Sequence, residues 1–124
     1  MKSRPRIANR ESRSYVQTMR MFKNHNDTLW SEWYEQGIPE TGEIIKRYVV
    51  YSYRYTWPLF VYEPMTGVWY ANVSKVSRTT SKHFTQAHPL VDMMPLRMED
   101  MITVARRGSV GLIESSNRSI GVTA

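Results

Sequence analysis

Residues 47–73 decide the fold, and they read RYVVYSYRYTWPLFVYEPMTGVWYANV. Aromatic and β-branched residues dominate this stretch, which is typical of β-strands. Proline and glycine signals divide it into three strands, Arg47–Tyr55, Leu59–Glu63 and Val68–Val73. The segment Pro64–Gly67 suits a hairpin turn, because proline presets φ at the first corner and glycine accepts a positive φ at the last. The stretch therefore predicts an antiparallel meander.

Amphipathic segments on both sides of these strands predict helices. Residues from Asn9 to Lys23 have a helical spacing of apolar side chains, and Asn9 is a suitable N-cap. The apolar residues of this segment are Tyr15, Val16, Met19 and Phe22. Leu96–Arg107 has acids in its first turn and arginines in its last, and Gly108 follows as a stop. Another helix is expected to begin near residues 79–81 and to end before Pro89.

These elements predict one α+β domain, a small antiparallel β-meander packed with an N-terminal helix and a C-terminal helix. We expect residues 1–8 to form a flexible basic lead, residues 9–113 the domain, and residues 114–124 a frayed tail. Leu29–Tyr34 fits two structures equally well. It is either a short helix capped by Asp27 or Thr28, or a strand edge that carries two tryptophans.

Length and composition exclude several classes of protein. The 124 residues suit a single compact domain, and 41% hydrophobic with 23% charged residues is ordinary globular composition. No stretch reaches the roughly 18 apolar residues of a membrane-spanning helix, so we expect no membrane partner. No apolar segment follows the basic start, as a secretory signal would require. The absence of cysteine excludes disulfides, thiolate metal sites and a cysteine nucleophile.

Charge is distributed unevenly along the chain, whose formal net charge is +6. Residues 1–23 hold seven basic side chains and one acid, whereas residues 24–45 hold five acids and no lysine or arginine. We call five arginines of the first segment the basic arm: Arg4, Arg6, Arg10, Arg13 and Arg20. Two interpretations remain open. The basic arm either folds onto the acidic middle or stays free to meet a polyanion.

Nine of the fifteen aromatic residues lie between Tyr48 and Tyr70. Aromatic side chains on a sheet can stack on nucleic-acid bases while nearby cations hold the phosphates. The predicted aromatic face consists of Tyr51, Tyr53, Tyr55, Trp69 and Tyr70. The alternative is that these rings belong to the hydrophobic core, with the tyrosine hydroxyls at its rim.

The densest polar cluster of the chain follows the predicted strands. Hydroxyls and cations at a helix start predict an anion site there, with protonated His83 as a possible phosphate contact. The predicted ligand-binding residues are Arg78, Thr79, Thr80, Ser81, Lys82 and His83. The alternative is a well-capped helix start with solvated cations.

Patterns that would indicate catalysis or a metal site are missing from the sequence. His83 and His88 are five residues apart, which does not place both on one helical face. No nucleophile-elbow motif accompanies the serines, and Glu99-Asp100 is explained by the helix dipole. We therefore expect a non-enzymatic protein with no metal and no cofactor.

Part of the chain resembles a family of small, largely uncharacterised bacteriophage proteins. The matching strings are Tyr48-Val49-Val50-Tyr51-Ser52-Tyr53, Pro58-Leu59-Phe60-Val61-Tyr62, Trp69-Tyr70-Ala71-Asn72, Lys75, and Ser77-Arg78-Thr79-Thr80-Ser81-Lys82-His83. The resemblance covers residues 48–86 and implies a gene product that acts in the cytoplasm of a bacterial host. Small phage proteins of this kind often act by binding nucleic acid, a host or defence protein, or a nucleotide signal.

Charge, aromatic content and this resemblance together predict a small phage-type accessory protein for host takeover or defence evasion. Its expected ligand is anionic and of nucleotide type, most simply nucleic acid. Two alternatives remain. The first is a protein–protein inhibitor that grips a host or defence enzyme through aromatic and methionine side chains, and the second is a sponge for a nucleotide immune signal.

Overall fold

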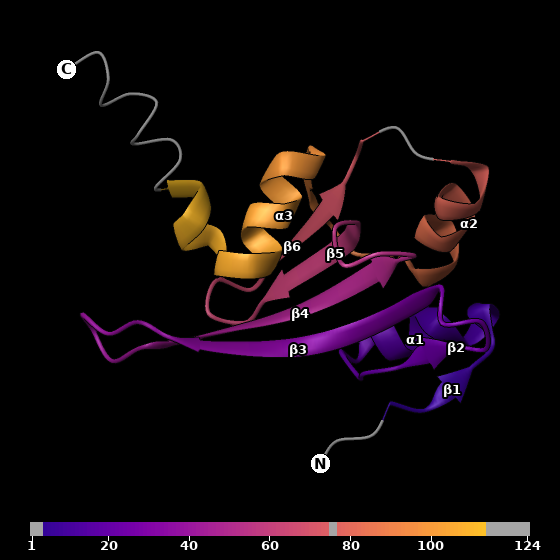
Figure 1. The fold of residues 1–124 in the computed structure, drawn as a ribbon, viewed down its shortest axis with the longest axis horizontal. Helices are drawn as coiled ribbons and strands as arrows, with labels where there is room; N and C mark the ends of the chain where they lie inside the picture. Colours follow the sequence, from indigo (N-terminus) through magenta and orange to yellow (C-terminus); the bar gives the residue numbers. More distant parts are fainter. Residues whose placement is uncertain (1–3, 75–76, 114–124) are drawn as a thin grey trace.

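A seven-stranded sheet forms the centre of the computed structural model, which describes residues 4–74 and 77–113 (Figure 1). The strands follow one another across the sheet in chain order. They are β1 (Arg6–Ile7), β2 (Lys23–Asn24), β3 (Leu29–Gly37), β4 (Ile44–Ser52), β5 (Pro58–Glu63), β6 (Val68–Asn72) and β7 (Met94–Leu96). Strands β2 to β6 pair antiparallel, whereas the outermost strands β1 and β7 pair parallel with their neighbours.

Helices cover both faces of this sheet. On one face η1 (Asn9–Glu11) and α1 (Ser12–Gln17) contact α2 (Arg78–Ala87), while α3 (Met98–Arg107) packs on β5 and β6 from the other face (Figure 1). Because both faces are buried, β5 is an almost continuous apolar run. The α+β class is confirmed, and the sheet is larger than the three strands expected from the sequence.

Three predictions from local signals are confirmed. The turn between β5 and β6 closes when the Gly67 N–H donates to the Glu63 carbonyl at 2.8 Å, and Gly67 has a φ of +68°. Helix α2 ends at Ala87, before Pro89 as expected, and it begins at Arg78, ahead of the expected range, because the Ser77 hydroxyl accepts from the Thr80 N–H at 3.2 Å. Helix α3 stops at Gly108, which has a φ of +71°. Each of these features depends on residues close together in sequence.

The helix expected over Asn9–Lys23 is shorter in the structure. Helix α1 stops early, and the chain turns at Met19, which has a φ of +54°, before it enters β2. Side chains of the sheet explain the break, because they take over carbonyls beyond the helix. The Trp33 Nε1–H donates to the Met19 carbonyl at 2.7 Å, and the Tyr48 hydroxyl donates to the Arg20 carbonyl at 2.7 Å.

The N-terminal lead and Leu29–Tyr34 both join the sheet. Within the lead expected to be flexible, Arg6 and Ile7 form β1, and the Ile7 side chain is buried. Residues 1–3 and the expected tail at 114–124 lie outside the described residues. Leu29–Tyr34 belongs to β3, so the strand alternative holds, and alternation places Trp30 and Trp33 on opposite faces.

Candidate functional site

Helix α3 occupies the β5–β6 half of its sheet face, and four aromatic rings occupy the neighbouring half over β3 and β4. We call Trp30, Tyr34, Tyr51 and Tyr55 the ring cluster. The Trp30 and Tyr51 rings stack with centroids 5.4 Å apart and planes 26° apart. Tyr55 meets both edge-on, at 5.1 Å from Trp30 and 5.0 Å from Tyr51. Tyr34 meets Tyr51 edge-on at 6.5 Å.

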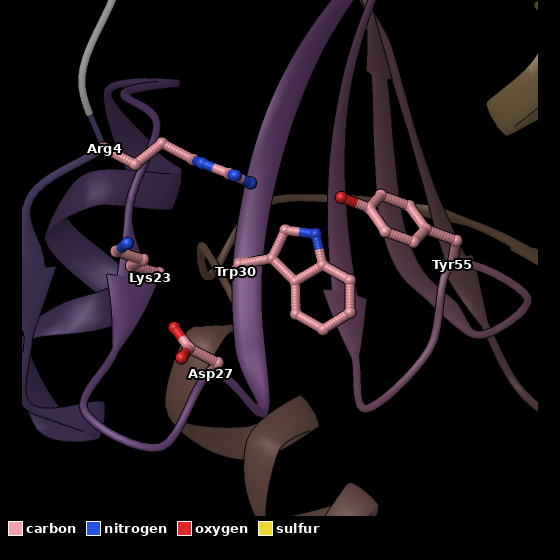
Figure 2. Close-up of a pocket in the computed structure, with 5 residues that line it drawn as sticks. All are labelled: Arg4, Lys23, Asp27, Trp30 and Tyr55. Carbon is pink, nitrogen blue, oxygen red and sulfur yellow. The ribbon is translucent and has the colours of Figure 1, made fainter.

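A hollow of about 370 Å³ lies between this cluster and the N-terminal strands (Figure 2). We call it the Trp30 pocket, and it is lined by Arg4, Lys23, Asp27, Trp30 and Tyr55. The sheet positions these side chains, because Lys23 of β2 is the register partner of Trp30 in β3. On its other side Trp30 is paired with Tyr51 of β4. The pocket therefore collects side chains that lie far apart in the sequence.

A second hollow of about 300 Å³ lies on the other side of Tyr55 and reaches the end of α3. We call it the Arg47 pocket, and its lining includes Tyr34, Arg47, Tyr51, Tyr55 and Arg106. Tyr55 lines both hollows, so the two pockets meet at its ring. Together they form an aromatic surface with arginine or lysine side chains at each end.

Ion pairs neutralise part of the charge around the Trp30 pocket. Arg4 pairs with Glu32 at 3.4 Å, and Arg6 pairs with Asp27 at 3.2 Å. Among the described residues, the Lys23 ammonium has neither an ion pair nor a side-chain hydrogen bond. Lys23 is therefore a cation that is available to an anionic ligand at this pocket.

The tyrosine hydroxyls of the ring cluster form a short hydrogen-bonded chain. The Tyr34 hydroxyl donates to Glu32 at 2.9 Å and lies 2.9 Å from the Tyr51 hydroxyl. Burial raises the pKa of Tyr51 to about 12, and burial also raises the pKa of Tyr34. Both phenols are therefore neutral near pH 7, which suits stacking and hydrogen bonding better than proton transfer.

The indole nitrogen of Trp30 is unusual in this setting. The Trp30 side chain is only 8% exposed, and its Nε1 is buried with no hydrogen-bond partner. A buried N–H without an acceptor costs about 1–3 kcal/mol of desolvation free energy. In Figure 2 the Tyr55 hydroxyl points toward this side of the indole ring, and no hydrogen bond joins the two.

The structure divides the predicted aromatic face between two sheet faces. Tyr51 and Tyr70 lie on the α3 face, and Tyr55 joins them at the rim of the ring cluster. Trp69 lies on the opposite face, because neighbours in a strand alternate. Tyr53 lies beyond the end of β4 and stacks on the His83 ring at 5.3 Å. The five rings therefore do not form one surface.

The predicted anion site on α2 is also divided. Arg78, Thr79, Ser81 and Lys82 are exposed, whereas Thr80 and His83 are buried. The His83 Nδ1 lies 2.8 Å from the Ser52 hydroxyl, and burial lowers the pKa of His83. A lowered pKa favours the neutral imidazole near pH 7, so the expected protonated phosphate contact does not fit this position.

A further hollow of about 470 Å³ lies where α2 begins. Only Thr80 of the six predicted ligand-binding residues lines it. Half of its lining comes from the segment between β4 and β5, including Tyr53, Arg54 and Trp57. The sequence separates this segment from α2, and the fold brings the two together. The Trp57 Nε1 is also buried there without a hydrogen-bond partner.

The basic arm is folded onto the body rather than free along its length. Arg4 and Arg6 pair with two acids of the acidic middle, as described above. Arg13 donates to the carbonyls of His88 and Thr85, each at 2.8 Å. Arg20 lies 4.1 Å over the Tyr15 ring, and Arg10 is exposed. Most of the arm therefore contributes to tertiary structure.

Sequence reasoning missed Trp30, Lys23, Tyr34 and Arg106 as residues of the candidate site. Their only common signal is residue type, since aromatic rings and cations are the groups that bind nucleotides. Their positions become neighbours only when the order of β2, β3 and β4 is known. That order depends on tertiary packing.

We expect the free energy of unfolding to decrease as pH falls below 6.5, the usual pKa of histidine. The unfolded chain binds a proton on His83 more readily than the folded chain, because burial lowers the folded pKa. The contribution is present above pH 6.5 and is lost as pH falls toward the folded pKa. Burial lowers the pKa of His88 as well, so it contributes with the same sign.

Urea denaturation between about pH 7.5 and 5 measures this effect. The variant His83→Gln should show a weaker dependence on pH than the unmodified protein. His25→Gln is the matched control, because it makes the same substitution at an exposed position. Equal pH dependence in the His83→Gln variant and the unmodified protein would contradict the expectation.

Within residues 4–74 and 77–113, no three histidine or carboxylate side chains are grouped to hold a metal ion. In the same part of the chain, no helix has the length and apolar character needed to cross a membrane. The resemblance to bacteriophage proteins stays a prediction, because no family model, curated protein or solved structure matches this chain.

Proposed function

We propose that this protein binds an anionic, nucleotide-type ligand, most simply single-stranded nucleic acid, and is not an enzyme. The observation that carries the proposal is the pair of pockets that meet at Tyr55. Trp30 lines one pocket with Lys23 and Arg4, Tyr34 and Tyr51 line the other with Arg106, and Tyr55 lines both. Bases stack on aromatic side chains while cations hold the phosphate backbone, so this arrangement supplies both kinds of contact.

A single strand suits this surface better than a duplex. The rings line hollows on the sheet, and paired bases in a duplex cannot leave their stack to reach them without a cost in free energy. The exposure of Tyr55 also favours a single strand, because this side chain is 55% exposed and an unpaired base can reach its ring from solvent. Successive bases would contact the rings on either side of it.

The site chemistry supports binding rather than catalysis. The raised pKa values of Tyr34 and Tyr51 keep their hydroxyls protonated, and no histidine lines either pocket. The resemblance to phage proteins is the basis for extending the proposal to host takeover or defence evasion in the bacterial cytoplasm. Binding to a defence-related nucleotide signal would use the same surface.

A protein–protein inhibitor is the second candidate function. Leu90, Val91 and Met94 are exposed apolar side chains close together in sequence at and before β7. Methionine and leucine on a surface are typical of contacts with other proteins. These residues lie outside both pockets, so variants there separate the two candidates.

Fluorescence anisotropy with a labelled single-stranded oligonucleotide tests the first proposal. We expect Tyr55→Ala to weaken binding roughly 5- to 150-fold, the range found for loss of one base–aromatic stack. Tyr55→Phe keeps the ring and should retain most of the affinity. Leu90→Ser should leave the affinity unchanged under this proposal. An oligonucleotide that binds neither the unmodified protein nor its variants would contradict the proposal and favour the inhibitor.

Salt dependence identifies the cations that contact the strand. Lys23→Gln and Arg106→Gln should each reduce the slope of log affinity against log salt by roughly 0.7, the value for one single-strand phosphate contact. Arg78→Gln and Lys82→Gln are the matched controls, since these exposed cations lie on α2 and outside both pockets. A larger loss in the control variants would move the binding surface to α2. Deleting residues 1–23 is a poorer test, because it removes β1 and α1.

A further inference from the structure

The buried Trp30 Nε1–H is a donor without an acceptor in the wall of a charged pocket. Buried polar groups in native proteins are nearly always satisfied, so an exception calls for an explanation. Here the explanation lies in the neighbours of the indole. Tyr51 stacks on the indole ring, and the edge that carries Nε1 faces Tyr55 (Figure 2). Tyr55 lines the Trp30 pocket together with Lys23 of β2, which lies on the other side of Trp30.

We propose that the Trp30 pocket binds one nucleotide, with the base held by Tyr55 and Trp30 and the phosphate held by Lys23 and Arg4. This inference rests on the proposed function and names the unit that the surface recognises. The base stacks on the ring of Tyr55 and accepts a hydrogen bond from the Trp30 Nε1–H. Every nucleobase has a π-face for stacking and at least one acceptor at its edge, so the pocket is tolerant of base identity.

Tyr55 is placed to admit the base. It lies between β4 and β5, outside both strands, so its ring can turn without breaking a strand pair. Its edge-on contact with Trp30 places the two planes 69° apart. A movement of Tyr55 away from the indole exposes the Nε1–H, toward which the Tyr55 hydroxyl points in Figure 2. The edge-on contact between Tyr55 and Trp30 is then replaced by stacking of the base on Tyr55 and by a hydrogen bond from the Trp30 Nε1–H to the base.

The charges around the pocket favour a phosphate in spite of Asp27. Arg6 pairs with that carboxylate and also donates to the His25 carbonyl at 2.8 Å, which holds the arginine beside it. The remaining cations are Lys23, which has no acidic partner among the described residues, and Arg4, which is shared with Glu32. Charge-assisted hydrogen bonds from such groups are the strong contacts of phosphate sites.

Isothermal titration calorimetry of the full chain with adenosine monophosphate, adenosine and inorganic phosphate tests the proposal. Adenosine monophosphate should bind with one site per chain, and adenosine and phosphate should each bind about tenfold or more weakly, because each lacks one set of contacts. Inorganic phosphate binding as tightly as the nucleotide would overturn the role assigned to the rings. Guanosine and cytidine monophosphates should bind within a few-fold of the adenosine compound.

Two indole variants locate the donor. Trp30→Phe keeps an aromatic ring and removes the N–H, and it should weaken nucleotide binding about three- to tenfold. Trp57→Phe is the matched control, since it removes the other buried and unpartnered indole N–H, which lies at the hollow beside α2. Weaker binding in Trp57→Phe with no change in Trp30→Phe would overturn the assignment of the pocket.

Lys23→Gln keeps the inference testable if Trp30→Phe unfolds. This half-buried side chain has no acidic partner among the described residues, so the variant should keep its melting temperature and lose about tenfold or more in nucleotide affinity.

Measuring oligonucleotide binding in parallel separates the nucleotide pocket from the proposed binding of a single strand. Tight strand binding with no mononucleotide binding and no effect of Trp30→Phe overturns the nucleotide pocket and leaves the proposed function standing. A mononucleotide that binds as tightly as any oligonucleotide supports the pocket and overturns the single-strand proposal.

Discussion

Replacing Arg47 with alanine should lower the free energy of unfolding by about 1.5–3 kcal/mol, the usual cost of losing a hydrogen bond that involves a charged group. The Arg47 side chain lies under the end of α3 and is only 4% exposed. Its Nε–H donates to the Ala105 carbonyl at 2.8 Å. The variant leaves the Ala105 carbonyl without this donor.

Lys46→Ala is the matched control for this prediction, because Lys46 is the preceding residue of β4 and points to the other side. Its ammonium is exposed and pairs with Glu35 at 3.7 Å. Exposed ion pairs contribute less than about 1 kcal/mol, so Lys46→Ala should be close to neutral. Urea denaturation at pH 7 measures both variants. Similar losses in the two would mean that Arg47 acts only as a surface charge.

Gly108→Ala should be the other strongly destabilising change, at about 2–4 kcal/mol when backbone strain and lost hydrogen bonds are combined. Gly108 has a φ of +71° and a ψ of −174°, a conformation that is almost restricted to glycine. A Cβ there would lie 2.9 Å from the Glu63 Oε2 and 2.9 Å from the Ile45 Cγ2. The Glu63 carboxylate cannot move freely, because it accepts from the Ser109 N–H at 2.7 Å and from the Ser109 hydroxyl at 2.6 Å.

Gly67→Ala separates the effect of backbone strain at a positive φ from the effect of a steric contact with neighbouring side chains. Gly67 has a φ of +68°, and nothing lies within 4 Å of the position of its Cβ. This variant should lose only about 1 kcal/mol, because alanine is strained at a positive φ and meets no neighbour. Thermal unfolding of the two alanine variants beside the unmodified protein gives the comparison. Equal melting temperatures in the two variants would show that the Glu63 contact has no energetic weight.

The features that could be predicted from the sequence are those with local causes. The Pro64–Gly67 turn, the end of α2 before Pro89 and the stop of α3 at Gly108 each depend on residues within a few positions of one another. Local backbone preference and the tertiary fold agree at these positions.

The features that could not be predicted depend on partners far away in the chain. The apolar spacing after Asn9 continues to Phe22, and these side chains are buried as expected. The helix nevertheless ends early, because Trp33 and Tyr48 bond carbonyls that a longer helix would use. Periodicity therefore indicated which side chains are buried and gave no information on where the helix ends.

The candidate site shows the same limit. Residues 77–83 form a conspicuous polar cluster in the sequence. The helix nevertheless buries Thr80 and His83 and leaves the cations Arg78 and Lys82 exposed to solvent. The two pockets at Tyr55 depend instead on the order of the strands and on a loop that carries Tyr55 over β4. Neither the strand order nor the path of that loop has a signal in neighbouring residues.

The short outermost strands have a consequence for self-association. Unpaired backbone at the border of a sheet is a template on which other chains can polymerise, and proteins limit it with brief or proline-containing strands. Here β1 offers two residues and β7 offers three, one of which is Pro95 with no N–H to donate. Strand β3 pairs with β2 only at Lys23 and Trp30, so the outer edge of β3 beyond that point and the start of β4 before Tyr48 extend past the neighbouring strands. This hairpin carries the exposed charged pair of Glu35 and Lys46, and charged side chains on an edge oppose strand addition. The two outermost strands are therefore protected by their shortness, and the extended hairpin by its charge.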